Sequence, residues 1–343
     1  MIDVGQLKIN KDNILSSLNF MKISDVIFSA TLSMSDLEKF KIDSYEVLKK
    51  ENNLITFINT SFEIEENDII FCQSDYLELF FKVFKNIGYK NIKLISSQSD
   101  RKINNNLYKK KPSCVSKWYS ANVNCTKSNL IPIPLGIAPY RNTKSVIFED
   151  LEKVNLSKDK KNKIYSNFNL NTNYFHRVSA FKQAHKNRDC DFKNFTSYDD
   201  YLNNLSQYKF SLAPWGNGID THRVWESLYL GVIPITKNHL HYRNLIDIPI
   251  LLISSYEKLS QIDFSINFEN IDYEKLTINW WKNIIDEKKE MKKNKKIQLI
   301  IDNDELDYFN KLIRKKYFVN NLLKKIMTSL RRLDSKFNIF RKI

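Results

Sequence analysis

The stretch that decides the fold is FSLAPWGNGIDTHRVWESLYLGVIPI, which runs from Phe210 to Ile235. An apolar run typical of a strand leads into the loop PWGNG, a helical pattern follows at once, and VIPI is typical of the next strand. In an open parallel sheet, ligands bind outside the carboxyl ends of the strands, where this loop is expected to lie. Its glycines let the backbone approach a ligand closely, and Asp220 or Thr221 can cap the helix. The stretch therefore predicts the ligand-binding unit of an α/β domain.

The charged side chains of this stretch favour an anionic ligand that carries hydroxyl groups. His222, Arg223 and Glu226 are three and four residues apart, so a helix places them on one side. Arginine suits phosphate oxygens, and glutamate can accept hydrogen bonds from two neighbouring hydroxyls. The backbone amides at the start of the helix also favour an anion. An ordinary ion pair between Arg223 and Glu226 on the helix surface stays open as an alternative.

Outside this stretch, short apolar runs alternate with helical patterns, which is typical of α/β layers. The expected strands are 25–30, 54–58, 68–72, 91–96, 164–168, 208–213, 232–235 and 249–253, and the expected helices are 76–87, 174–186 and 197–207. We expect two Rossmann-like domains with parallel sheets facing a central cleft. The predicted limits are 1–140 for the first domain, 141–305 for the second, and 306–343 for a basic helical tail.

The order of residues in the opening stretch resembles the donor-binding segment of GT-B glycosyltransferases. The similarity is greatest to the exostosin-like group, which includes bacterial and viral relatives. The matching positions are Phe210, Leu212, Pro214, Gly216, Arg223, Glu226, Leu228, Gly231, Pro234 and Ile235. The stretches SKWYSANVNC, IPIPLGIA and FNLNTNYFHRVSAF also resemble parts of that family, so the similarity covers roughly residues 68–255. It implies a GT-B fold with a C-terminal helix that crosses back onto the first domain.

The resemblance also implies a donor site for a nucleotide sugar, UDP- or GDP-linked, without a further cofactor. Glu226 would bind the ribose and Arg223 the diphosphate. The other expected donor-binding residues are Thr172, Asn173, Arg177, Gly216, Asn217, Gly218, Asp220, Thr221 and His222.

Sugar transfer with inversion needs a base for the acceptor hydroxyl and positive charge for the departing diphosphate. Asp100 and Asp75 each follow an apolar run in the first domain, IKLIS and DIIFC, and are the candidate bases. Each can instead be a helix cap or a turn residue. Cationic side chains and a helix start can stabilise the diphosphate, so we expect inverting, metal-independent chemistry with no metal ligands.

The charge of the chain is concentrated near its end. The formal net charge is +15, and residues 305–343 contain eleven Lys and Arg against three Asp and Glu, which gives +8. Such a tail suits the surface of an anionic membrane or nucleic acid. No nucleic-acid recognition motif accompanies it, so we expect no nucleic-acid partner.

The remaining features favour a cytoplasmic protein, with peripheral contact at the inner membrane face through the basic tail. The chain has no run of 18 apolar residues, its first residues lack the layout of a signal peptide, and its four cysteines are widely spaced. The sequence predicts a glycosyltransferase of polysaccharide biosynthesis, with a glycan or lipid-linked oligosaccharide as acceptor. Two alternatives stay open, a catalytically silent relative that binds glycans or nucleotide sugars, and a nucleic-acid-binding protein.

Overall fold

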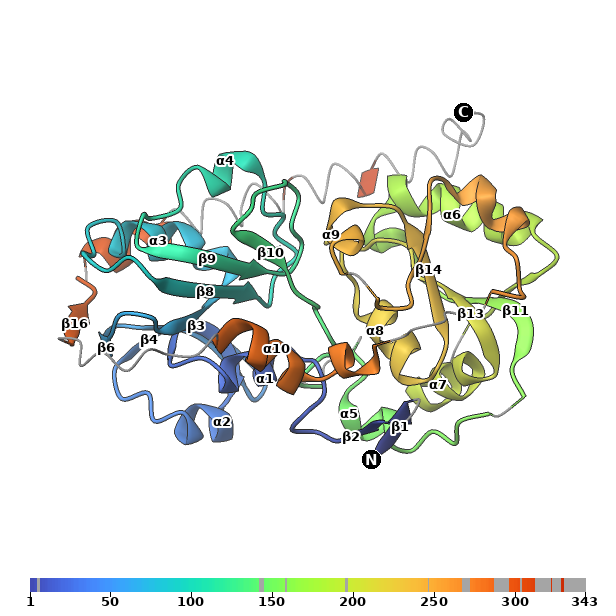
Figure 1. Cartoon of the computed structure of the whole chain (residues 1–343), viewed down its shortest axis with the longest axis horizontal. Coiled ribbons are helices and arrows are strands. Elements are labelled where there is room, and N and C mark those ends of the chain that lie inside the picture. Colours follow the sequence, from blue (N-terminus) through green and yellow to red (C-terminus); the bar gives the residue numbers. More distant parts are fainter. Residues whose placement is uncertain are drawn as a thin grey trace.

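The chain forms two α/β halves, each built around its own sheet, in a computed structural model (Figure 1). The structure describes residues 1–4, 7–141, 145–157, 159–194, 197–245, 247–266, 272–286, 296–302 and 304–311, together with 322, 328 and 329. Within these residues, no helix has the length and apolar character needed to cross a bilayer. The basic tail, on which the expected membrane contact depends, lies mostly outside the described residues.

The first half contains a seven-stranded sheet in the order β10-β9-β8-β7-β3-β5-β4. Its strands are β3 (Val26–Ser33), β4 (Tyr45–Glu51), β5 (Leu54–Asn59), β7 (Ile69–Gln73), β8 (Ile92–Ser97), β9 (Val115–Ser120) and β10 (Leu130–Pro132). The strands from β10 to β3 run parallel, whereas β5 and β4 are antiparallel to their neighbours. The expectation of a purely parallel sheet is therefore wrong here. The connection from β4 to β5 is a tight turn at Asn52, whose φ is 52°, and strands joined so closely must be antiparallel.

Helices cover the first sheet and bring aromatic side chains into its core. They are α1 (Ser17–Lys22), α2 (Met34–Lys39), α3 (Leu77–Val83) and α4 (Asn105–Tyr108). The expected helix at 76–87 is confirmed as α3, although it ends earlier. Phe80 and Phe84 stack at 4.1 Å, and Phe28 from β3 meets Phe80 edge-on at 5.3 Å. Burial of these rings fixes α3 against the sheet.

The second half contains five parallel strands in the order β12-β11-β13-β14-β15. They are β11 (Lys161–Ser166), β12 (Cys190–Phe192), β13 (Tyr208–Leu212), β14 (Ile233–Lys237) and β15 (Leu251–Ile253). The helices are α5 (Phe148–Leu151), α6 (Tyr174–Lys186), α7 (Tyr198–Ser206), α8 (His222–Tyr229) and α9 (Leu240–Arg243). The expected strands and helices of this half are confirmed. The α/β class is also confirmed, and both halves are consistent with Rossmann-like domains.

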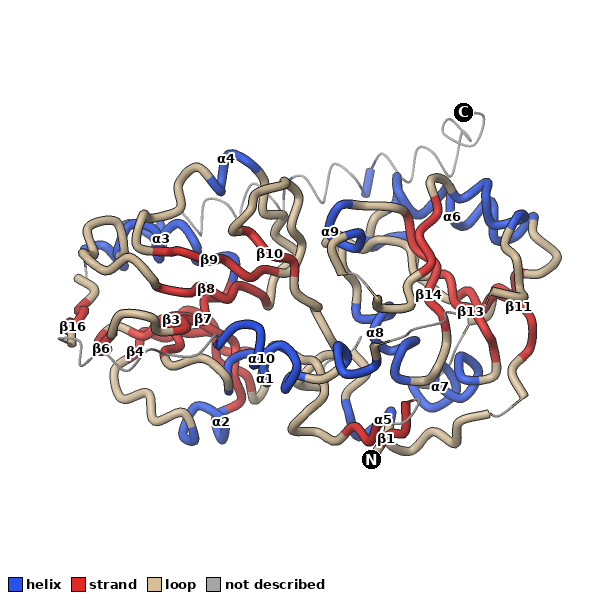
Figure 2. Tube along the Cα trace, viewed as in Figure 1, coloured by secondary structure: helices blue, strands red, loops and turns tan. Residues whose placement is uncertain are grey.

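Each half is completed by a segment from the far end of the sequence: the first strands of the chain lie with the second half, and a late helix lies with the first half. The hairpin of β1 (Ile2–Val4) and β2 (Leu7–Ile9) lies beside α5 and α7 (Figure 1). In the other direction, α10 (Ile278–Asp286) packs on the first half, where Trp281 meets Phe20 at 6.4 Å and Lys93 donates to the carbonyl of Ile285 at 2.7 Å. Figure 2 shows α10 beside α1, far from the strands of the second sheet.

The chain after α10 stays with the first half. Strand β16 (Ile297–Ile300) pairs with β6 (Ser61–Ile64), and the helical residues 304–311 bury Leu306 and Phe309 in the same aromatic core. The two halves are thus tied by both terminal segments as well as by the direct connection after β10.

Candidate functional site

The loop between β13 and α8 is held by a side chain from the other half. Asn122 Oδ1 accepts hydrogen bonds from the backbone amides of Ile219 at 2.7 Å and Asp220 at 2.9 Å. Its Nδ2 donates to the carbonyl of Ser99 at 3.0 Å. The amides just before α8, which we expected to face an anion, are therefore bonded to protein instead. Asn122 joins this loop to the loop that follows β8.

The two glycines of the loop have different surroundings. A Cβ atom on Gly218 would lie 2.8 Å from Asn122 Oδ1, so this glycine permits contact between the halves rather than with a ligand. A Cβ on Gly216 would lie 3.6 Å from Arg177 Nη2 and 3.8 Å from Thr172 Cγ2, which is ordinary contact. Asn217, between them, is exposed.

Asp220 is a buried structural residue and not a ligand contact. Its side chain has no exposed surface. The carboxylate accepts hydrogen bonds from five groups, namely the backbone amides of Leu135 and Thr221, the indole of Trp225, the hydroxyl of Tyr242 and, at 3.4 Å, Nε2 of His241. Because these partners surround the carboxylate, its expected place in the donor site is wrong.

The side chains of His222 and Thr221, at the start of α8, have different surroundings. His222 Nδ1 is 2.7 Å from the carbonyl oxygen of Gly136, so this ring faces the junction between the halves. Thr221 is the N-cap residue, yet its side chain makes no capping hydrogen bond. Its Oγ1 is buried and has no hydrogen-bond partner among the described residues.

Arg223 and Glu226 are separated by a tyrosine that both contact. Tyr201, from α7, donates to Glu226 Oε2 at 2.7 Å, and the Arg223 guanidinium lies 5.8 Å from the centre of the same ring. Glu226 is only 6% exposed. In the described part of the chain, no ion pair joins Arg223 to Glu226, and Arg223 Nε is buried without a partner. The alternative of an ordinary surface ion pair is therefore wrong.

The start of α6 lies against the same loop. Asn173 Nδ2 donates to the carbonyl of Gly216 at 2.6 Å, and the neighbouring Thr172 is exposed. Arg177 is 5% exposed and donates to three carbonyls, those of Trp215 at 2.9 Å, Asn169 at 2.7 Å and Pro214 at 3.3 Å. Arg177 thus fixes the loop.

The second half places two guanidinium groups, those of Arg177 and Arg223, near each other. Burial and, to a smaller extent, the charge of Arg223 lower the pKa of Arg177 to about 10. Among the residues with a described position, neither arginine forms an ion pair with a carboxylate. Arg177 is buried and Arg223 is partly buried, and two neighbouring cations that pair with no described carboxylate favour a negatively charged ligand.

The first half contributes one of the two candidate bases to this region. Asp100 is exposed on the loop after β8. Its negative charge raises the pKa of Arg177 and so offsets a small part of the effect of burial. Asp75 lies in the turn Ser74–Tyr76, where its carbonyl oxygen is 3.4 Å from Nη1 of Arg101, which pairs with Glu78. Asp100 follows Ser99, whose carbonyl is bonded to Asn122, so it lies on the loop that Asn122 ties to the second half. No described contact brings Asp75 there.

Sequence reasoning missed several residues of this region, above all Asn122, Tyr201, His176 and Trp215. Tyr201 lies on the buried face of α7 with Leu202 and Leu205, so its position looked like ordinary core. Asn122 stands in a run of small and polar residues with no distinguishing spacing. The contacts that give both residues a role come from segments 25 and 97 positions away.

Possible metal ligands are dispersed where the structure describes them. No group of three or more His, Cys, Asp or Glu side chains is assembled among those residues. The chain has two Asp-x-Asp triplets, at 189–191 and 302–304. In the first, Asp191 forms an ion pair with Lys163 at 3.0 Å and accepts from the Tyr208 hydroxyl at 2.9 Å.

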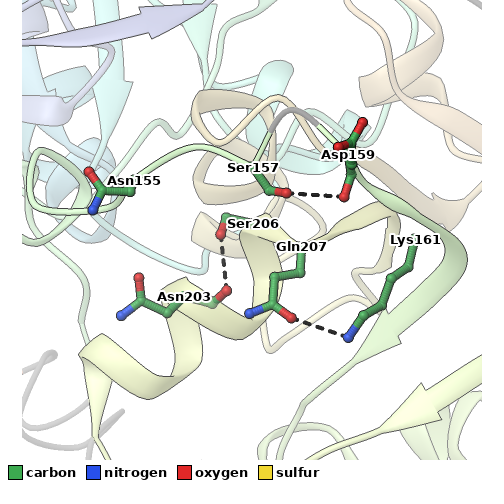
Figure 3. A pocket seen from close by; sticks show the side chains of 7 residues that line it. All are labelled: Asn155, Ser157, Asp159, Lys161, Asn203, Ser206 and Gln207. Atoms are coloured by element: carbon green, nitrogen blue, oxygen red, sulfur yellow. Dashed lines mark hydrogen bonds between the residues drawn. The ribbon is translucent and has the colours of Figure 1, made fainter.

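A surface pocket of about 440 Å³ lies at the end of the second sheet that is opposite to the loop between β13 and α8 (Figure 3). It is lined by Asn155, Ser157, Asp159, Lys161, Asn203, Ser206 and Gln207. Lys161 begins β11 and Gln207 precedes β13, so the pocket lies at the amino ends of the parallel strands. Ligands of such sheets bind at the carboxyl ends, and the pocket is therefore not the candidate site.

Comparisons with known proteins add no family to these observations. No protein-family model matches the chain, and a search of curated proteins finds no significant match. Any functional assignment therefore rests on the chemistry of the site.

Proposed function

We propose that the protein is a glycosyltransferase of the GT-B type that binds a nucleotide sugar, UDP- or GDP-linked, at the loop between β13 and α8. The observation that carries the proposal is the pair of cations Arg177 and Arg223 beside the buried carboxylate of Glu226. A sugar nucleotide has phosphates for the cations and a ribose diol for the carboxylate. Both groups belong to the nucleotide part of the donor.

Each residue has a distinct part in binding this donor. Arg223, with its unpartnered Nε, contacts phosphate, and Arg177 adds charge while holding the loop. Glu226 accepts hydrogen bonds from the ribose hydroxyls. Oε2 of Glu226 accepts the hydrogen bond from the Tyr201 hydroxyl, so Oε1 is the oxygen that faces the ligand. Thr172, Asn173 and Gly216 line the side of the site formed by α6.

The transfer itself is a displacement at the anomeric carbon. Asp100 takes the proton from the acceptor hydroxyl, whose oxygen forms the new bond to carbon while the bond from carbon to the diphosphate breaks. The electron pair of the broken bond goes to the phosphate oxygen, where the arginines stabilise the charge without a metal ion. Asp100 is preferred to Asp75 because only Asp100 lies near the second half. The acceptor, a glycan or lipid-linked oligosaccharide, binds along the first half.

Cellular placement follows from the proposed acceptor. A cytoplasmic enzyme with peripheral contact at the inner membrane face would meet lipid-linked acceptors and sugar nucleotides in one compartment. The basic tail would provide that contact through anionic lipids. Nucleic acid has no part in this proposal.

The first test measures thermal stabilisation by UDP-, GDP- and CMP-sugars, followed by sugar release and transfer. A ligand at 100 times its Kd stabilises the folded state by about 2.7 kcal/mol, which a melting curve resolves. One nucleotide class should raise the melting temperature of the wild type, and Glu226→Gln and Arg223→Ala should lose that shift. Glu38→Gln, on the exposed side of α2 in the first half, is the matched control and should keep it.

Two outcomes would change the conclusion. Binding without sugar release or transfer to any acceptor would favour the catalytically silent relative. A wild type that no nucleotide or nucleotide sugar stabilises would refute the donor site itself.

A further inference from the structure

Beside the donor loop, three aromatic rings from three segments form a stack. His176, in the first turn of α6, lies nearly flat on Trp215, with ring centres 4.5 Å apart and an interplanar angle of 19°. His239, which caps α9, meets Trp215 edge-on at 5.0 Å. His239 Nε2 lies 3.0 Å from Asn124 Oδ1, so the stack reaches the first half. The His176 ring is therefore held in place next to Arg177 and Gly216.

The hydrogen bonds of His176 leave one nitrogen without a partner. Its Nδ1 lies 3.3 Å from the hydroxyl of Tyr256, which is itself buried. With that hydroxyl as donor, the ring proton is on Nε2. His176 Nε2 and Trp215 Nε1 are both buried and have no partner among the described residues. Two orphaned N–H groups in one stack indicate a missing acceptor, because buried polar groups are normally hydrogen-bonded.

The charges around His176 are nearly all positive. Burial, and then the charges of Lys237, Arg177 and Lys102, lower the pKa of His176 to about 4, so the ring is neutral at physiological pH. Lys237 ends β14, and Lys102 comes from the first half, on the loop that carries Asp100. The acid on the neighbouring element is Glu257, whose own pKa is lowered by Ser255 and, to a smaller extent, by Lys237. The missing acceptor is therefore expected to be an anion.

We propose that His176 donates a hydrogen bond from Nε2 to the distal phosphate of the nucleotide, in a subsite completed by Lys237 and, from the first half, Lys102. This inference rests on the proposed function. It assigns the phosphate nearest the sugar to His176, Lys237 and Lys102. His176 keeps its proton: the electron pair of the breaking bond goes to the phosphate oxygen, and the neutral ring stabilises that oxygen by a hydrogen bond. Since Lys102 belongs to the other half, the subsite is complete only when the halves are together.

The test compares binding of nucleoside mono- and diphosphates by calorimetry, with UMP and UDP, then GMP and GDP. The wild type should bind one diphosphate about 10- to 100-fold more tightly than its monophosphate, as expected for hydrogen bonds to a charged group. His176→Phe keeps the stacked ring but lacks the N–H, and it should lose most of that preference with little change for the monophosphate. His176→Gln, which can place an amide N–H near the same point, should recover part of it.

Lysine variants separate the subsite from general surface charge. Lys102→Ala should reduce the preference for diphosphate, whereas Lys109→Ala, an exposed lysine on the same connection, should not. If Arg223→Ala abolishes binding while His176→Phe and Lys102→Ala keep the full preference, the donor site stands and the subsite is refuted. If the wild type binds none of the four nucleotides, the proposed function fails and the subsite fails with it.

Discussion

Replacing Asn122 with alanine is expected to destabilise the protein more than any other single change at the loop before α8. The side chain is 1% exposed, accepts from the amides of Ile219 and Asp220, and donates to Ser99. Alanine removes the acceptor of two buried amides, each worth about 1–3 kcal/mol when left unsatisfied. Residue 122 also has a φ of 58°, which asparagine adopts more readily than alanine, so the change adds backbone strain of at most about 1–2 kcal/mol.

The sum of these contributions is about 2–8 kcal/mol, and water that enters the vacated space recovers part of it, so we expect a loss of about 4 kcal/mol. That is a large share of the roughly 5–15 kcal/mol that stabilises a typical domain. The assay is urea-induced unfolding at 25 °C, followed by tryptophan fluorescence and by circular dichroism. Because Asn122 joins the two halves, the two signals should change together in the wild type and separate in the variant.

Two matched variants divide the loss into its causes. Asn122→Gly tolerates the positive φ, so its difference from Asn122→Ala measures the backbone strain. Asn122→Asp keeps an oxygen for both amides and should retain most of the stability. A loss below about 1 kcal/mol in Asn122→Ala would mean that the amides find other partners, and the joining role would be refuted.

Two further changes test the site. Tyr201→Phe keeps the ring beneath the Arg223 guanidinium but removes the donor to Glu226, so UDP or GDP should bind about 10-fold more weakly by calorimetry, and unchanged affinity would contradict the positioning role. The pH dependence of stability follows from His176 and His239, since burial lowers the pKa of each to about 4 from 6.5. Between these values the unfolded chain binds more protons than the folded one, so the melting temperature should fall as the pH drops from 6.5 towards 4. Replacing both histidines with glutamine should flatten that fall, and an equally steep fall would show that other groups cause it.

The local pattern of the sequence was sufficient to predict most of the second half. The helix expected at 174–186 has those bounds as α6, and Ser197 caps α7 through the amide of Asp200. These elements show clear apolar runs separated by turn residues. Strand β4 was missed because its side chains are nearly all exposed and include two lysines and two glutamates, so it shows no apolar alternation.

The roles of individual site residues depended on contacts that no local pattern reveals. Asp220 looked like a helix cap or a ligand contact, but its partners Leu135 and Tyr242 come from 85 and 22 positions away. Gly218 looked like a glycine for close ligand approach, and the group that approaches it is Asn122. Residue types and spacing identified the loop, whereas the direction of each side chain depends on the fold around it.

The crossing of both chain ends has a consequence for how the molecule can be divided. A fragment that stops near residue 140 would keep the first sheet but leave Phe20 without Trp281. The complementary fragment would lose Ile2 and Ile9, which are buried in the core shared with α8. Both pieces would expose apolar surface and be prone to aggregation. Exchange of one half between related proteins, by recombination or in the laboratory, therefore requires three junctions rather than one.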